Sequence, residues 1–278
     1  MAAQVERARW EARYRFFPDA NGFPADTDCT AIAAGALYEH GLLPDADLNT
    51  CARELFKAAA PGDEEATLPG RGDENALCPQ VFMVYWEDEA EPFALRRGRK
   101  QDPVACANAL YTVQLAGRPL ADDGQAAATV EATTRYLADH LISSRYLGGT
   151  RYYPSPDAFL YAASRLCARF PDTTALLAGP LRRAFHRREA TAPSQGLAAV
   201  PGRSLNLAFR TLTADHLGLT AGQEERRALL AALQRDDGSW PPCSYYRMGR
   251  FPVYFGSPYL TTVFALAALR SGVREDCG

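Results

Sequence analysis

Small and apolar residues fill several long stretches of this chain at helical spacing, and residues that favour turns separate these stretches. Five of the stretches carry few charges and follow a turn rich in Pro, Gly or Asp. They begin at residues 28, 103, 156, 204 and 258. A helix that is apolar around most of its circumference belongs in the interior of a protein. We therefore expect five buried helices.

Between them lie amphipathic stretches, with Arg, Glu and Asp on one face and Leu, Ala and Tyr on the other. These cover residues 48–59, 126–141, 174–188 and 224–233. The last four buried stretches begin about 50 residues apart, a period typical of solenoids and closed toroids. The alternation predicts an all-α fold, a single α/α toroid of about five to six inner and outer helix pairs. Residues 4–16 are predicted to form a further outer helix that closes the ring.

We expect one domain over residues 1–278, because no linker divides the chain. Residues 61–102 form a long loop insertion, longer than a compact domain usually carries without a function. Within it, the apolar and aromatic residues 81–86 predict a short strand or a segment packed over a cavity. A second long connection, residues 238–257, is rich in aromatic residues. Both connections precede buried helices, so we expect both at the end of the toroid where Asp28 lies.

Charge and cysteine content limit which kinds of function are compatible with the sequence. The net charge of −3 argues against nucleic-acid binding, which needs a basic surface. The one basic run, residues 96–100, predicts a solvated loop that could also attract a diphosphate. No apolar run is long enough to cross a membrane and no signal peptide is visible, so we expect a cytoplasmic protein. Seven scattered cysteines, without a C-x-x-C pair, favour reduced thiols.

Residues 26–31 read Asp-Thr-Asp-Cys-Thr-Ala and stand at the start of the first buried helix. Free backbone N–H groups and the helix dipole stabilise carboxylates there, so helix capping is one interpretation. The same residues resemble the D-C-T-A motif of oxidosqualene cyclases. They also resemble the D-x-D-D-T-A motif of squalene-hopene and class II diterpene cyclases, with Cys in place of the last Asp. Residues 234–240, Gln-Arg-Asp-Asp-Gly-Ser-Trp, resemble the Q-x-x-x-G-x-W repeat of that superfamily.

The resemblance to class II terpene cyclases implies an isomerase in which Asp28 is the general acid. In those enzymes the matching Asp protonates a double bond or an epoxide. An alkene is a very weak base, so the acid must be neutral and poorly solvated, and burial raises the pKa of a carboxyl group. Asp26 would supply or share the proton. Cys29 would donate a weak hydrogen bond to Asp28.

The substrate implied by this resemblance is a linear isoprenoid or a prenylated small molecule. No metal or other cofactor is required for protonation, although a diphosphate-bearing substrate could bring Mg²⁺. Aromatic faces can hold the resulting cation. The candidates lie in loops before buried helices or in their first turns, where they could instead plug the end of the toroid. They are Tyr85, Trp86, Tyr152, Tyr153, Phe159, Tyr254, Phe255 and Tyr259.

Two further polar residues are candidates. Asp157, at the start of the third buried stretch, is expected at the height of Asp28, as a second acid or the final base, or as the cap of its own helix. Asn108 lies among Ala and Cys residues, where an amide is unexpected unless it meets a polar group. It could hydrogen-bond Asp28 or bridge two helices. In the resembling repeat, the residues that match Gln234 and Trp240 are structural.

Alternatives remain open. The resembling cyclases use two helical domains, so the 61–102 insertion, a homodimer partner or a second subunit would have to cover the cavity here, unless the activity has changed. A zinc-dependent prenyltransferase-like protein needs three or four ligands, and no histidine falls in the first turn of a buried helix. The histidines are His40, His140, His186 and His216. A non-catalytic toroid that binds an apolar ligand or a protein partner would need no acid.

Overall fold

The structure is a computed structural model that describes residues 2–18, 22–62, 77–87, 90–91, 93–117, 124–191 and 203–271. Its described residues form helices joined by loops, with two short strand pairs, which confirms the prediction of an all-α fold. The chain divides into two compact units, Met1–Leu137 and Ala138–Gly278, and each is described by itself. The closed toroid and the single domain over residues 1–278 stay predictions.

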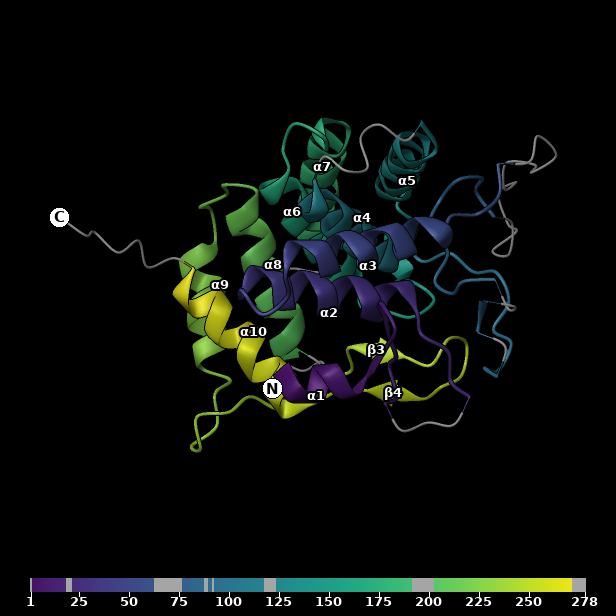
Figure 1. The fold of residues 1–278 in the computed structure, drawn as a ribbon. Helices are drawn as coiled ribbons and strands as arrows, with labels where there is room; N and C mark the ends of the chain where they lie inside the picture. The colour runs from purple at the N-terminus through teal and green to yellow at the C-terminus, as the bar shows by residue number, and fades with distance from the viewer. Residues whose placement is uncertain are drawn as a thin grey trace. The chain divides into compact units, whose positions relative to one another are not determined.

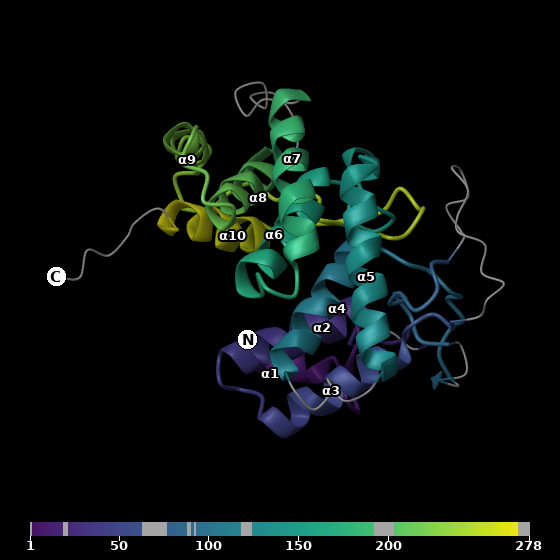
Figure 2. The ribbon, with the colours of Figure 1, turned by 90° about the horizontal axis from the view of Figure 1, so that it is seen from above.

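The first unit contains four helices of its own and the start of a fifth among its described residues (Figure 1). They are α1 (Ala2–Arg7), α2 (Thr27–Glu39), α3 (Asp45–Lys57), α4 (Pro103–Ala116) and α5 (Gly124–Ile142), which ends in the second unit. Strands β1 (Arg9–Trp10) and β2 (Arg13–Tyr14) pair antiparallel, with Arg9 opposite Tyr14 and Trp10 opposite Arg13. Helix α2 packs against α3 and α4, as Figure 2 shows.

Small residues bring α2 and α4 close together. A Cβ atom on Gly35 of α2 would lie 2.9 Å from Oγ1 of Thr112 on α4, too near for an undisturbed contact. The Thr112 hydroxyl donates a hydrogen bond of 2.7 Å to the backbone oxygen of Ala31. A core cluster that includes residues of α2 contains Tyr14, Ala34, Leu37, Leu43, Leu48 and Cys51. Helix α2 is therefore held both by close contact with α4 and by apolar packing.

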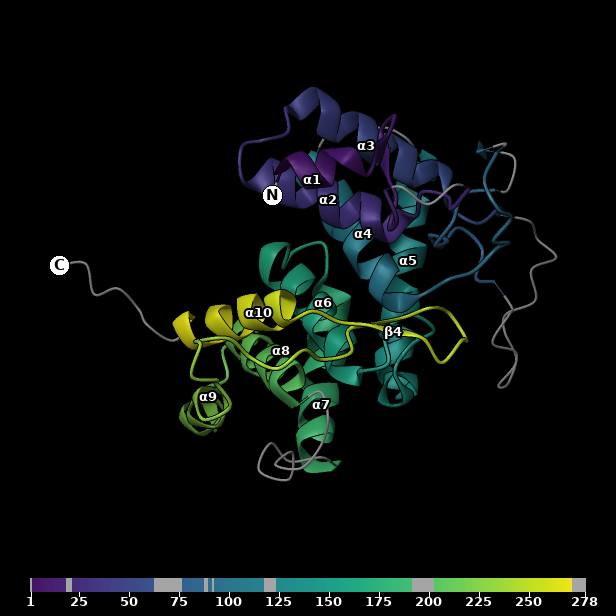
Figure 3. The same cartoon turned by 90° about the horizontal axis from the view of Figure 1, so that it is seen from below.

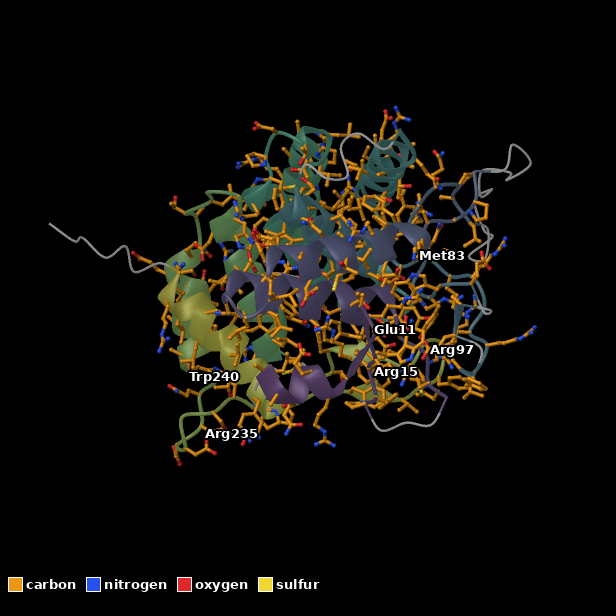
Figure 4. The ribbon with its side chains drawn as sticks, viewed as in Figure 1. Glu11, Arg15, Met83, Arg97, Arg235 and Trp240 are labelled. Carbon is orange, nitrogen blue, oxygen red and sulfur yellow. The ribbon has the colours of Figure 1, made fainter. Side chains whose placement is uncertain are left out.

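The helix predicted over residues 4–16 is wrong. Helix α1 ends at Arg7, and the chain then turns through the β1–β2 hairpin, in which Glu11 has a positive φ of 55° (Figure 4 labels Glu11). The hairpin buries Tyr14, whose backbone N–H donates to Oγ1 of Thr30 on α2 at 2.9 Å. Contacts with the rest of the unit therefore override the local helical pattern.

Residues 81–86 are buried, and Phe82 forms an isolated antiparallel bridge with Ala59. The segment is thus packed in the interior and forms one bridge rather than a strand, and its packing over a cavity stays a prediction. Residues 63–76 of the insertion lie outside the described part.

The second unit contains five complete α-helices in its described part. They are α6 (Pro156–Arg169), α7 (Ala175–Thr191), α8 (Arg203–His216), α9 (Gln223–Ala231) and α10 (Pro258–Arg270). A short 3-10 helix covers Arg145–Gly148. Strands β3 (Tyr246–Arg247) and β4 (Tyr254–Phe255) pair antiparallel, with Tyr246 opposite Phe255, and lead into α10 (Figure 3). Helices α8, α9 and α10 pack around a core of Leu207, Ala208, Leu212, Leu230, Trp240, Ala265 and Ala268.

Trp240 joins the last two of these helices. Its indole N–H donates to the backbone oxygen of Leu230 on α9 at 2.8 Å, and its backbone N–H donates to Oγ1 of Thr262 on α10 at 3.1 Å. The Gln234 side chain donates to the backbone oxygen of Gly238, which has a φ of +81° that favours glycine. Figure 4 shows Trp240 beside the turn that carries Arg235. These contacts favour a structural role for Gln234 and Trp240.

The five predicted starts of buried helices each fall within one residue of an observed start, at α2, α4, α6, α8 and α10. Three of these helices begin with a capping side chain followed by Pro, at Asp102–Pro103, Ser155–Pro156 and Ser257–Pro258. Such pairs are strong helix starts because the side chain accepts a free N–H and Pro needs none. None of the described helices has both the length and the hydropathy to cross a membrane.

Candidate active site

Asp26 and Asp28 lie together at the start of α2. Asp26 is the N-cap residue, and its Oδ1 accepts a hydrogen bond of 2.7 Å from the backbone N–H of Cys29. Asp28 follows in the first turn of the helix. Only 6% of Asp26 and 8% of Asp28 is exposed to solvent. The sequence therefore places two carboxyl groups in one buried half-turn, where helix N–H groups point toward them.

Two buried threonines hold this half-turn in place. The backbone N–H of Thr27 donates to the backbone oxygen of Val84 at 2.8 Å. The Thr27 hydroxyl donates to the backbone oxygen of Met83, also at 2.8 Å (Figure 4 labels Met83). On the other side, Thr30 accepts the hydrogen bond from Tyr14 of β2. The start of α2 is thus clamped between β2 and the buried segment 81–86, which limits how far either carboxyl group can turn toward water.

Asn108 reaches Asp28 from the neighbouring helix α4. Its Nδ2 donates a hydrogen bond of 2.8 Å to Oδ1 of Asp28, and the side chain is buried. The hydrogen bond to Asp28 that the sequence suggests for Asn108 is therefore present. An amide N–H aimed at this oxygen orients the carboxyl group and stabilises the anion that a proton transfer would leave behind.

Burial and the negative charge of Asp28 raise the pKa of Asp26 to about 7. Hydrogen bonds from the backbone and thiol of Cys29 lower the pKa of Asp26 again, but only in part. Two carboxyl groups this close titrate as a pair, so the pair keeps a proton at a pH where an ordinary aspartate is ionised.

Cys29 stands in the first turn of α2, and its backbone N–H donates to Oδ1 of Asp26. The hydrogen bond from its thiol to Asp28 stays a prediction. Burial, together with the nearby charges of Asp26 and Asp28, raises the pKa of the thiol well above its usual value. Cys29 therefore remains a neutral S–H donor.

An apolar groove of about 890 Å³ runs along the face of α2 that carries Cys29. Helix α1, the end of the β1–β2 hairpin and the residues after it form its other walls. The lining residues are Ala2, Gln4, Val5, Ala8, Tyr14, Arg15, Phe16, Pro18, Cys29, Ile32, Ala33, Ala36, Leu37, His40 and Leu42. The groove is large enough for a small apolar ligand. It meets the acid pair at Cys29, whose backbone N–H donates to Asp26.

Tyr85 and Trp86 are buried against basic side chains of the first unit. The Arg97 guanidinium lies 5.4 Å and the Lys100 ammonium 5.9 Å from the centre of the Tyr85 ring. Arg13 lies 4.3 Å above the Trp86 ring, whose N–H donates to the backbone oxygen of Glu54 at 2.9 Å. A cavity of about 20 Å³ beside them holds about one water molecule. These contacts favour a packing role for Tyr85 and Trp86. Their role in substrate binding stays a prediction.

Asp157 is completely buried in the second unit between two arginines. Arg188 donates to its two carboxylate oxygens at 3.0 and 3.1 Å, and Arg210 donates to Oδ1 at 3.0 Å. The cap of α6 is Ser155, which accepts from the backbone N–H of Asp157, so Asp157 does not cap its own helix. A carboxylate fixed by two cations is suited to holding helices together. Its role as a second acid or as a base stays a prediction.

The remaining predicted aromatic residues lie in the second unit. Tyr152 stacks on Tyr246 with ring centres 5.6 Å apart, and Tyr153 meets Tyr245 edge-on at 5.1 Å. Other pairs are Phe159 with His140 and Tyr146, and Phe255 with Tyr246. Tyr254 and Tyr259 are exposed.

Three aromatic residues that the sequence pattern did not mark extend this cluster along α6, α8 and α10. They are Tyr161, Phe209 and Phe264, and Tyr245 connects them to Tyr153. Their helical spacing resembles that of ordinary core residues, so only their position between one and two turns inside buried helices could have marked them.

Among the residues that the structure describes, no three His, Cys, Asp or Glu side chains gather closely enough to hold a metal ion. The zinc alternative therefore has no candidate ligand set in this part of the chain.

Two comparisons with known proteins bear on this site. No family model matches the chain. The chain is similar to the drimenol cyclase drtB of Aspergillus calidoustus, with 26% identity over 247 residues. The match covers 89% of this chain but only 38% of that enzyme, so the chain spans well under half the length of this relative. At this identity the chain is a distant relative of that cyclase.

Proposed function

We propose that this protein is a terpene cyclase-like enzyme that protonates a double bond or an epoxide of a linear isoprenoid or prenylated small molecule. The resulting carbocation then closes one or more rings. The observation that carries the proposal is the buried pair Asp26 and Asp28, with Asn108 bonded to Asp28. The similarity to a drimenol cyclase supports it.

Asp28 is the general acid in this proposal. Its O–H bond breaks as a new C–H bond forms on the alkene, which leaves a carboxylate on Asp28 and a positive charge on the neighbouring carbon. The hydrogen bond from Asn108 stabilises that carboxylate. Asp26, with its pKa raised to about 7, holds the proton of the pair and passes it to Asp28 before the reaction, and the pair takes up a new proton after each turnover. The cation ends by losing a proton to a base or by taking up water.

The apolar groove along α2 is the proposed site for the hydrocarbon chain. It lies beside Cys29, whose backbone N–H donates to Asp26, and most of its lining side chains are apolar. A substrate that carries a diphosphate would bring Mg²⁺ with it. A cytoplasmic location, and a homodimer partner or second subunit that covers the site, also remain proposals.

The test is incubation of the protein with geranyl, farnesyl and geranylgeranyl diphosphates and with prenylated aromatic compounds, with products identified by mass spectrometry. We expect a cyclic product from at least one of them. Asp28→Asn should lower turnover by a factor of about 10² to 10⁴, the usual contribution of a general acid. Asp45→Asn is the matched control, because Asp45 also lies in the first turn of a helix but is exposed.

The proposal fails if the folded wild-type protein gives no product, or if Asp28→Asn retains full turnover. The apolar groove also favours a second candidate, a non-catalytic protein that binds an apolar ligand. In that case the wild type would bind a farnesyl chain without changing it, and Asp28→Asn would bind it equally well.

A further inference from the structure

Three consecutive backbone N–H groups hold the segment of chain that leads into the acid pair. Those of Asp26 and Thr27 donate to backbone oxygens of the hairpin and of the segment 81–86, at 3.2 and 2.8 Å. The N–H of Ala25 donates instead to a side chain, to Oε2 of Glu91 at 2.9 Å. Glu91 is therefore the partner that a substitution can remove without changing the backbone.

Glu91 is buried and is shared between two partners. Only 7% of it is exposed. Its Oε1 accepts from Nε of Arg15 at 3.0 Å, so the guanidinium neutralises the carboxylate whose Oε2 accepts from Ala25. Arg15 also faces Ala25 across an isolated antiparallel bridge. A buried carboxylate is costly unless it is paired and hydrogen-bonded, and Glu91 meets both conditions. One side chain of the insertion thus joins the end of the hairpin to the residue before the N-cap.

The same side chain lines the small cavity beside Ala25. This cavity has a volume of about 20 Å³, enough for about one water molecule, and Pro24 and Ala25 form part of its wall. The other lining residues are Arg13, Tyr85, Trp86, Glu87, Glu91, Ala94, Leu95 and Arg97 (Figure 4 labels Arg97). Without the Glu91 side chain this space would enlarge, and more water would reach the backbone next to Asp26.

The orientation of Asp26 depends on the backbone that Glu91 holds. Asp26 has an extended backbone, with φ of −133° and ψ of 158°, from which its side chain reaches the N–H of Cys29. A change in these angles would turn the carboxyl group away from the helix and toward water. Asp28 and Cys29 are the titratable groups that act on Asp26 from its own helix. The charged groups on the cavity side are Arg13, Arg15, Glu87, Glu91 and Arg97.

We propose that Glu91 is a positioning residue for the acid pair, which fixes the backbone before α2 and keeps water away from Asp26. The insertion then supports the acid from outside, through the Ala25 hydrogen bond. The consequence for catalysis rests on the proposed function, because a hydrated Asp26 holds its proton less well and leaves Asp28 without a supply. The positioning itself does not rest on it.

The test compares the apparent pKa of the Asp26–Asp28 pair, followed by NMR of the carboxyl carbons, in the wild type and in two variants. Glu91→Ala removes the acceptor and opens the cavity. The pKa should then fall from about 7 by roughly one to two units, as Asp26 becomes solvated. Glu91→Gln keeps both the side-chain volume and an oxygen for the Ala25 N–H, so its pKa should stay within roughly half a unit of the wild type.

In the product assay the same variants should differ in their pH dependence. A general acid acts only while it is protonated, so a lower pKa moves the alkaline limb of kcat to lower pH. Glu91→Ala should therefore lose about tenfold in turnover at pH ~7 and should approach the wild type at pH ~5. A variant that only loosens the fold would lose turnover at both pH values.

Glu54→Ala is the matched control. Glu54 is a partly buried carboxylate that pairs with another arginine of the same hairpin, Arg13, at 2.7 Å. Its loss should lower the melting temperature without moving the pKa of the acid pair. If Glu91→Ala does not fold, Glu91→Asp makes the same test, because it keeps the charge but shortens the side chain by one methylene group.

An unchanged pKa in Glu91→Ala, or an equal fall in Glu91→Gln, would overturn the inference. So would an equal fall in the Glu54→Ala control. The NMR measurement requires no turnover. A protein that makes no cyclic product but shows the expected shifts would therefore refute the proposed function and leave the inference standing.

Discussion

The pKa of Asp26 makes a direct prediction about stability. Burial and the charge of Asp28 raise this pKa from 3.8 to about 7. The folded protein therefore binds more protons than the unfolded chain between these two pH values, so its stability falls as pH rises through this window. Each unit of pKa corresponds to about 1.4 kcal/mol, which gives a loss of about 4 kcal/mol from pH ~4 to pH ~8.

Asp26→Asn should remove this loss. An Asn at the N-cap position accepts the hydrogen bond from the Cys29 backbone as an Asp does, so the helix start remains intact. At low pH the variant and the wild type should have similar free energies of unfolding, because Asp26 is then neutral. Above pH ~8 the variant should be more stable by about 4 kcal/mol, since no buried charge forms at residue 26.

The measurement is urea unfolding of both proteins at a series of pH values between ~4 and ~9. The difference in their free energies of unfolding reports on the Asp26–Asp28 pair, because all other titrating groups are common to both proteins. For the exposed Asp45→Asn control, this difference should stay nearly constant with pH. A constant difference for Asp26→Asn as well, or a variant that is less stable than the wild type at high pH, would refute the reasoning about the acid pair.

Three further predictions follow from single contacts. Asn108→Ala removes the donor to Asp28, so turnover in the product assay should fall about 10- to 100-fold and the free energy of unfolding by about 1–3 kcal/mol; unchanged kinetics would contradict the orienting role. Asp157→Asn leaves Arg188 and Arg210 without a full counter-charge and should cost about 3–5 kcal/mol in urea unfolding; a loss below about 1 kcal/mol would contradict the structural role. Gly35→Ala should lower stability by about 1–3 kcal/mol, because the new Cβ meets Oγ1 of Thr112, and a shorter residue at 112 should restore part of it.

Helix positions were predictable because their signals are local. A capping side chain followed by Pro marks a helix start without reference to the rest of the fold, as at Ser155–Pro156 and Ser257–Pro258. The error at residues 4–16 has the opposite cause. Glu and Arg at helical spacing favour a helix there, but burial of Tyr14 and its hydrogen bond to Thr30 stabilise a hairpin instead. Local propensity is a weak preference that such contacts outweigh.

The features of the candidate site also fall into those set by local sequence and those set by tertiary packing. The sequence alone determined that Asp26 and Asp28 share one half-turn at the start of a helix, because their spacing and the cap are local. Only the tertiary structure decided that Asn108 donates to Asp28 and that an apolar groove lies alongside. Burial and contacts between residues 80 positions apart depend on how helices pack, and a pKa depends on burial, so neither can be read from local spacing.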